Sequence, residues 1–149
     1  MVAGRGQIRC LPDGRGLVLS SAILGVVQAY RPDGSVAWTA RLARFEASEV
    51  RALSPTSGRV VYPASGLRDR IASLISVGTG RLLVQVVRES ALDNSTINVR
   101  STIIDEADGR VLGYQEDLPL LLAAGNGLVA RPGAGSLDLV GYSLQGAAP

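Results

Sequence analysis

The sequence predicts an all-β protein built from antiparallel strands. Most segments alternate apolar and polar residues with a period of two, as in "SVAWTARL", where Val36, Trp38 and Ala40 share one face. Glycine-bearing turns separate these segments, as in "LPDGRG", "RPDGSV", "PTSGRV", "VGTGRL", "EADGRV", "GNGLVA" and "RPGAGS". Short strands separated by such turns are typical of sheets made of hairpins.

Taken in order, the periodicity and the turns divide the chain into short strands. The predicted strands are Gln7–Leu11, Gly16–Ser21, Val26–Arg31, Ser35–Leu42, Val50–Leu53, Arg59–Tyr62, Ile71–Val77, Arg81–Arg88, Ile97–Asp105, Arg110–Tyr114, Leu120–Ala124, Leu128–Ala130 and Ser136–Leu144. The segment "RLLVQVVR" is apolar almost throughout, which predicts a strand covered on both faces. In "SGLRDRIASLIS", Leu67, Ile71 and Leu74 recur at helical spacing; we favour a loop followed by a strand from Ile71, with a helix as the alternative.

The Asp-Gly turns have a specific geometry. In "AYRPDGSVAW", Pro32 fixes φ near −65°, so we expect a type I turn closed by Gly34 in the left-handed conformation. The sequence Ala107-Asp108-Gly109 fits the same template. Calcium binding by Asp105, Glu106 and Asp108 is the weaker alternative, because the spacing of a calcium loop is missing.

The strands group into a repeating unit of four. Gln7–Leu42 forms one unit, Ile71–Glu116 a second and Leu120–Leu144 a third with three strands, while Val50–Tyr62 forms an additional hairpin. Antiparallel four-stranded units of about 40–50 residues are typical of β-propeller blades. We therefore expect residues 1–149 to form a single partial β-propeller domain of about three blades.

The stretches "LPDGRGLVLSSAILGVVQAYRPDGSVAWTARL", "IASLISVGTGRLLVQVVRES" and "IIDEADGRVLGYQEDLPLLLAAGNGLVARPG" carry a family likeness. Together they resemble the C-terminal half of bacterial six-bladed β-propeller proteins related to the NHL-repeat group. The resemblance implies a binding or scaffold domain, although a minority of such propellers are enzymes and several are exported. A three-blade arc cannot close by itself, so we expect either a homodimer that completes six blades or a fragment of a longer propeller.

Composition excludes several kinds of site. The apolar fraction of 46% and the charged fraction of 19% indicate a folded chain with a core. Histidine is absent, which removes the usual nucleophile arrangements and histidine metal sites, so we predict no catalytic residue, no metal and no cofactor. Cys10 is the single cysteine and alternates with Ile8, which favours a buried apolar position.

Charge and hydropathy also limit the partners and the location. The formal charge is +2 and all fifteen basic residues are arginines spread along the chain, so we predict no nucleic-acid partner. The longest apolar runs are far shorter than the roughly 20 residues of a membrane helix. The N-terminus has no secretory signal, so we expect a cytoplasmic protein, or an exported one if an N-terminal segment is missing.

The favoured function is a non-catalytic binding module that associates with a second copy of itself or with another protein. Trp38 is expected to pack between blades, with stacking on a ligand as the alternative. The competing function is an enzyme in which Arg81 and Arg110, at the blade tops, hold an anionic substrate. The carboxylate pairs Glu46/Glu49 and Glu116/Asp117 fall in polar linkers, where solvated surface is expected rather than glycosidase chemistry. Trp38, Arg81 and Arg110 are therefore the predicted contacts for a ligand or partner.

Overall fold

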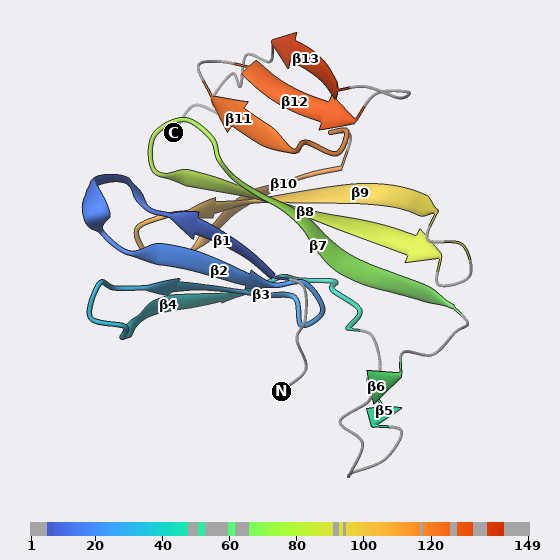
Figure 1. The fold of residues 1–149 in the computed structure, drawn as a ribbon, viewed down its shortest axis with the longest axis horizontal. Helices are drawn as coiled ribbons and strands as arrows, with labels where there is room; N and C mark the ends of the chain where they lie inside the picture. The colour runs from blue at the N-terminus through green and yellow to red at the C-terminus, as the bar shows by residue number, and fades with distance from the viewer. Residues whose placement is uncertain are drawn as a thin grey trace.

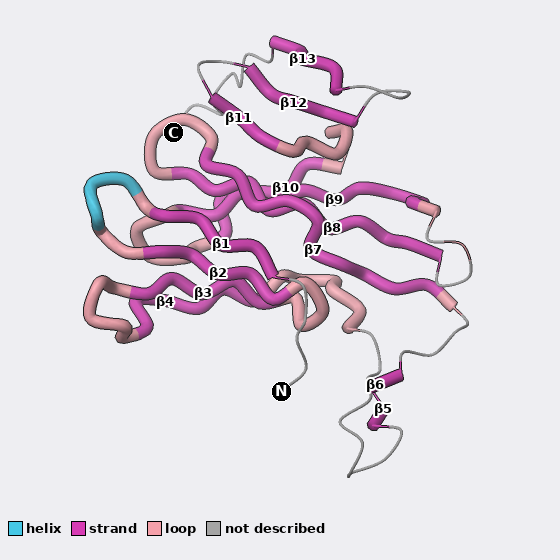
Figure 2. The backbone as a smooth tube through the Cα atoms, viewed as in Figure 1, coloured by secondary structure: helices cyan, strands magenta, loops and turns pink. Residues whose placement is uncertain are grey.

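The chain folds into antiparallel β-sheets. The computed structural model describes residues 6–47, 51–52, 60–61, 66–90, 93, 95–116, 118–125, 128–132 and 137–141. Within these ranges the one helical element is the short 3-10 turn η1 (Pro12–Gly14), drawn in cyan in Figure 2. No helix in the described part of the chain is long and apolar enough to cross a membrane. The all-β prediction is confirmed.

The first sheet contains β1 (Gly6–Cys10), β2 (Leu17–Ser21), β3 (Val26–Tyr30) and β4 (Val36–Arg41), paired in that order. The turn between β3 and β4 has the expected geometry. Gly34 has a φ of 83°, its amide donates to Arg31 O at 2.9 Å, and the register of the strands shifts at Ala29/Tyr30. Asp33 Oδ1 accepts hydrogen bonds from the amide and hydroxyl of Ser35 at 2.9 and 2.7 Å, so this aspartate stabilises the turn.

The second sheet contains β7 (Leu67–Ser76), β8 (Arg81–Ser90), β9 (Thr96–Asp105) and β10 (Val111–Gln115), in the order β10-β9-β8-β7. The predicted loop before Ile71 is wrong, because β7 begins at Leu67. A register shift between Ile71 and Ser73 places Ile71 and Leu74 on the same face of the strand. Because of this bulge, apolar residues that are three positions apart in the sequence share a face in a strand, a spacing that otherwise indicates a helix.

The remaining strands form two smaller sheets. The third sheet contains β11 (Ala123–Gly125), β12 (Leu128–Pro132) and β13 (Leu137–Gly141), and β5 (Arg51–Ala52) pairs with β6 (Val60–Val61). The three-stranded unit and the additional hairpin lie where the sequence predicts them. A glycine turn also joins β9 and β10 of the second sheet. Gly109 has a φ of 76°, and Asp105 N donates to Arg110 O at 2.8 Å.

The three larger sheets stack in chain order, with the second sheet in the middle (Figure 1). Their first strands are neighbours, since β7 contacts both β1 and β11. Side chains of β1 reach the backbone of β7: Gln7 Nε2 donates to Ala72 O at 2.5 Å and Arg9 Nε to Leu74 O at 3.1 Å. The backbone amide of Ile71 also donates to Ala22 O at 3.0 Å.

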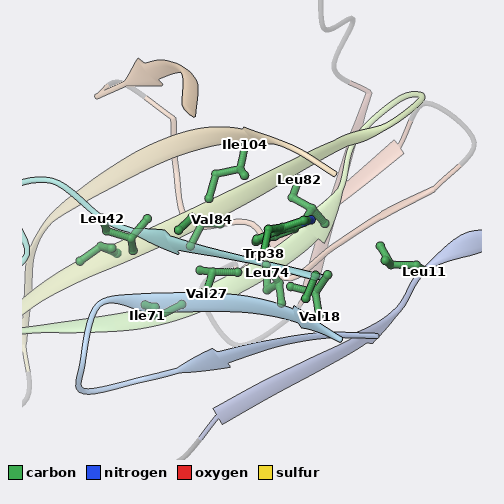
Figure 3. Close-up of a cluster of buried hydrophobic side chains, with 13 residues drawn as sticks. Leu11, Val18, Val27, Trp38, Leu42, Ile71, Leu74, Leu82, Val84 and Ile104 are labelled. Atoms are coloured by element: carbon green, nitrogen blue, oxygen red, sulfur yellow. The ribbon is translucent and has the colours of Figure 1, made fainter. Parts of the chain in front are cut away.

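Two apolar clusters cover the two faces of the second sheet. The larger joins it to the first sheet and includes Val18, Val27, Trp38, Ile71, Leu82, Val84 and Ile104 (Figure 3). The smaller contains Ile75, Val77, Leu83 and Leu121, with Ile103 and Leu118 packed against it. Residues 82–87 of β8 are all buried, which confirms the prediction of a strand covered on both faces.

The outer face of the first sheet carries several exposed apolar side chains. Cys10 lies there and is exposed, so the prediction of a buried cysteine is wrong. Ile8, on the same strand, is 65% exposed. Leu17 pairs with Cys10, and Val36 lies in the same row across the sheet because Tyr30 pairs with both Leu17 and Val36. Leu17 and Val36 are 37% and 47% exposed. The prediction that Val36 shares a face with Trp38 is therefore wrong, because the register shift at Ala29/Tyr30 interrupts the alternation. Alternation also does not show whether a face is covered.

Candidate functional site

The space between the first and second sheets has two ends. We call the end that carries the turns at residues 31–35 and 105–110 the turn end, and the end that carries residues 42–46 the opposite end. The predicted contact Trp38 lies near the turn end. Its side chain is 8% exposed and packed in the core, and its Nε1 donates to Glu106 O at 2.9 Å. A Cβ atom at Gly109 would lie only 2.5 Å from the indole ring, so the turn of the second sheet closes directly over it.

Arg81 and Arg110, the two predicted arginines, lie at the turn end of the second sheet. Arg81 pairs with Asp105 across β8 and β9, and Asp105 is bonded through its backbone to Arg110. The guanidinium of Arg110 is 69% exposed and lies 4.0 Å from Asp105 and 3.9 Å from Asp108. The fold therefore brings both arginines to one edge, but the ion pairs of Arg110 are long and solvated.

Glu106 also lies at the turn end, and its side chain is 2% exposed. Its carboxylate is 3.8 Å from Arg15 Nη2, and its amide donates to Gly80 O at 2.9 Å. The contact with Arg15 links the η1 turn of the first sheet to the second sheet. Nothing in the turn sequence distinguishes this buried acid from the exposed ones beside it.

Charged side chains gather at the opposite end, where the sequence predicts no site. Arg44, Glu46, Asp69, Arg88 and Arg100 form a connected group, which we call the Asp69 network. The Asp69 side chain is fully buried, and its Oδ2 accepts from Arg100 Nη2 at 2.5 Å and from the Glu46 amide at 2.8 Å. Arg100 Nη1 donates to Arg44 O at 2.8 Å, and Arg88 pairs with the Glu46 carboxylate. The network ties residues 44–46 to the second sheet.

A second ionic group lies beside this network on β7 and β8. Glu89, whose side chain is 7% exposed, pairs with Arg70 and with Arg68 at 3.4 Å. Burial acts to raise the pKa of Glu89, but the hydrogen bond and the charge of Arg70, assisted by Arg68, outweigh it and hold the pKa below its ordinary value. Glu89 is therefore a structural anion rather than a group poised to exchange protons near neutral pH.

A pocket of about 390 Å³ opens at the opposite end between residues 42–45 and strands β8–β10. It is lined by Leu42, Ala43, Arg44, Phe45, Val86, Arg100, Ser101, Thr102, Tyr114 and Glu116. Phe45 packs over the turn at Gly25, where a Cβ atom would lie 2.4 Å from its ring. Arg44 and Glu116 are 3.7 Å apart, with side chains 83% and 69% exposed. The pocket thus combines an apolar lining with exposed charges.

Sequence reasoning misses this site for identifiable reasons. Asp69 falls in the segment predicted as a loop, where an acid is expected in solvent. Glu46 and Glu116 fall in segments interpreted as solvated linkers, and both are largely exposed, with side chains 62% and 69% accessible. The alternation Arg68-Asp69-Arg70 is the one available signal, because in a strand it places the acid on the face opposite to the two bases.

Among the described residues no group of three or more histidine, cysteine, aspartate or glutamate side chains is arranged to hold a metal ion. No protein-family model matches the chain, and no curated protein matches its sequence.

Proposed function

We propose that the protein is a non-catalytic binding module of the β-propeller type, with the pocket at the opposite end as its binding site. The stacked antiparallel sheets, with their first strands β1, β7 and β11 side by side, support a blade-like arrangement. The finer relationship to six-bladed, NHL-related propellers rests on the sequence resemblance.

One observation carries the binding function. The charged groups of the Asp69 network are engaged with each other: Arg100, which lines the pocket, with Asp69, and Arg88 with Glu46. Groups held in this way shape a surface instead of reacting, while Leu42, Phe45 and Tyr114 offer an apolar and aromatic lining. Small-molecule sites combine such apolar walls with a few fixed polar groups.

Amide NMR spectra recorded during a screen of small neutral and charged fragments test this function. We expect binding fragments to shift the amides of Val86, Thr102 and Tyr114 and to leave those of Arg81 and Arg110 unchanged. Shifts confined to Arg81 and Arg110 with anionic fragments would instead favour the anion-clamping enzyme. A screen in which no fragment perturbs the pocket would reject the proposed site.

We also propose that the chain associates with a second copy through the outer face of its first sheet. This face exposes the apolar side chains of Ile8, Cys10, Leu17 and Val36. A further sheet that packs on it becomes the next layer of the stack. In this arrangement the third sheet of the second copy covers that face, and two such contacts complete a six-sheet ring. Light scattering then gives twice the 15.5 kDa chain mass, and Ile8→Arg reduces it to the single mass. A wild-type monomer at micromolar concentration would contradict the dimer and favour a fragment of a longer propeller.

A further inference from the structure

The inter-sheet pocket has an apolar body of a size that suits a small organic ligand. Leu42 and Val86 belong to the buried core and Phe45 packs against it, while Tyr114 is 59% exposed and forms part of the lining. The volume of about 390 Å³ falls within the range of roughly 300–1,000 Å³ that small-molecule sites occupy. A ligand with an apolar or aromatic body can therefore bury it here.

The charged rim of the pocket contains a pair that can open. Arg44 and Glu116 come from segments far apart in the sequence, and their charged atoms lie 3.7 Å from each other. Both side chains are mostly in solvent, where such a pair contributes little stability. A competing anion can therefore take the place of Glu116 beside the guanidinium at small cost.

The backbone holds Arg44 at this position. Arg44 has a φ of 59° and is the one non-glycine residue with positive φ in the described part of the chain. Its carbonyl is fixed by Arg100 Nη1, and Arg100 is in turn held by the buried Asp69. Unusual backbone conformations of this kind concentrate at ligand clamps, where surrounding contacts maintain them.

The cation at the rim that an anionic ligand can reach is Arg44, whose side chain is 83% exposed. Of the residues that line the pocket, Arg44 and Arg100 are cationic and Glu116 is anionic. Asp69 neutralises Arg100 from behind, so the guanidinium of Arg44 is the one whose partner is exchangeable. A carboxylate suits it because a guanidinium can donate two parallel N–H bonds to the two carboxylate oxygens.

We propose that this pocket binds a small amphipathic carboxylate, with its apolar body against Phe45 and Tyr114 and its carboxylate in the place of Glu116 on Arg44. This proposal rests on the proposed binding function and assigns it a ligand class. Binding breaks the Arg44–Glu116 pair, forms the Arg44–ligand pair and releases the Glu116 carboxylate to water.

The test compares 3-phenylpropanoate with its neutral amide, 3-phenylpropanamide, by calorimetry and amide NMR on the full chain. We expect the acid to bind at least about fivefold more tightly than the amide, because only the acid pairs with Arg44. Both the acid and the weaker amide should shift Thr102 and Tyr114, since the apolar body occupies the same lining.

Three variants separate the roles of the rim charges. Arg44→Gln should weaken binding of the acid about fivefold and leave binding of the amide unchanged. Glu116→Gln should strengthen binding of the acid about two- to fivefold, because it removes the internal competitor. Arg110→Gln, at the turn end, is the matched control and should change nothing; thermal unfolding checks that each variant is folded.

The outcomes distinguish this inference from the function on which it rests. Equal binding of acid and amide at the pocket, or weaker binding of the acid by Glu116→Gln, overturns the carboxylate assignment while the binding site stands. Absence of binding by both probes overturns the assignment as well, and the broader fragment screen decides separately whether the pocket binds ligands.

Discussion

The space between the first and second sheets is closed in different ways at its two ends. At the turn end Trp38 fills the space, and the turn at Gly109 lies against its ring. At the opposite end Phe45 covers only part of the space, and the Asp69 network secures the adjoining segment. A pocket remains there beside Phe45.

If the pocket binds a ligand as proposed, one end of this space serves stability and the other serves recognition. A buried aromatic ring with one hydrogen bond excludes water and contributes stability through apolar area. A network of partly exposed arginines instead fixes a segment in place while leaving room and polar groups accessible to a ligand. The chain has one tryptophan and one phenylalanine, and each packs over a turn glycine at one of the two ends.

The largest expected effect is at the turn end, for Trp38→Ala. Removing this buried ring leaves a cavity and should lower the free energy of unfolding by about 4 kcal/mol, measured by urea denaturation. Trp38→Phe keeps a ring but loses the bond to Glu106 O, and we expect it to cost about 1–2 kcal/mol. A loss of under about 1 kcal/mol for Trp38→Ala would show that this end is not closed by apolar packing.

At the opposite end the largest effect is expected for Asp69→Ala. The substitution removes the carboxylate that pairs with Nη2 of the largely buried Arg100 and accepts from the Glu46 amide, and it should cost about 3 kcal/mol in the same urea experiment. Glu116→Gln is the control, because its exposed pair with Arg44 contributes at most about 1 kcal/mol. Equal losses for the two variants would mean that burial of the network does not matter.

Much of the fold follows from the sequence because turns and alternation are local properties. The hairpin at Gly34 is an example: Pro32 sets one torsion angle, and Gly34 adopts the positive φ that the turn requires. The strand β8 is recognisable because a short strand that is apolar almost throughout requires cover on both faces. The β7 boundary is misplaced because a bulge changes the period of two at one position.

The candidate site does not follow from the sequence because it depends on contacts between distant segments. Asp69 and Arg100 are 31 residues apart, and Arg44 and Arg100 are 56 residues apart. No local pattern indicates which arginine meets which carboxylate across a sheet interface. Cys10 shows the same limit, because its exposure depends on whether another sheet covers the first one.

We expect a loss of stability of intermediate size when either of the two glycines that face aromatic rings is substituted. Gly109→Ala and Gly25→Ala each add a Cβ within about 2.5 Å of a ring, and each position has a positive φ, so both should cost about 2–3 kcal/mol. Gly34→Ala is the matched control: φ is 83° there with no atom near the added Cβ, and only the backbone cost of about 1 kcal/mol is expected. Thermal unfolding measures all three, and equal losses would show that the rings yield without cost.

The smallest expected effect is the dependence of stability on acid pH, and it comes from Glu89, whose partners Arg68 and Arg70 lie on the face of β7 opposite to Asp69. The folded pKa of Glu89 is held below its ordinary value, since the arginine pairs outweigh burial. The unfolded chain therefore binds a proton at this site more readily, so the stabilisation is complete above the ordinary glutamate pKa and is lost as the pH falls through the folded one. Urea denaturation at a series of pH values from about 7 to about 3 should show this loss, and Glu89→Gln should reduce its slope.

Asp33→Asn provides the comparison at the turn end, where hydrogen bonds from Ser35 lower the pKa of an exposed carboxyl. An unchanged slope in Glu89→Gln would show that the Arg68 and Arg70 pairs do not stabilise the ionised form.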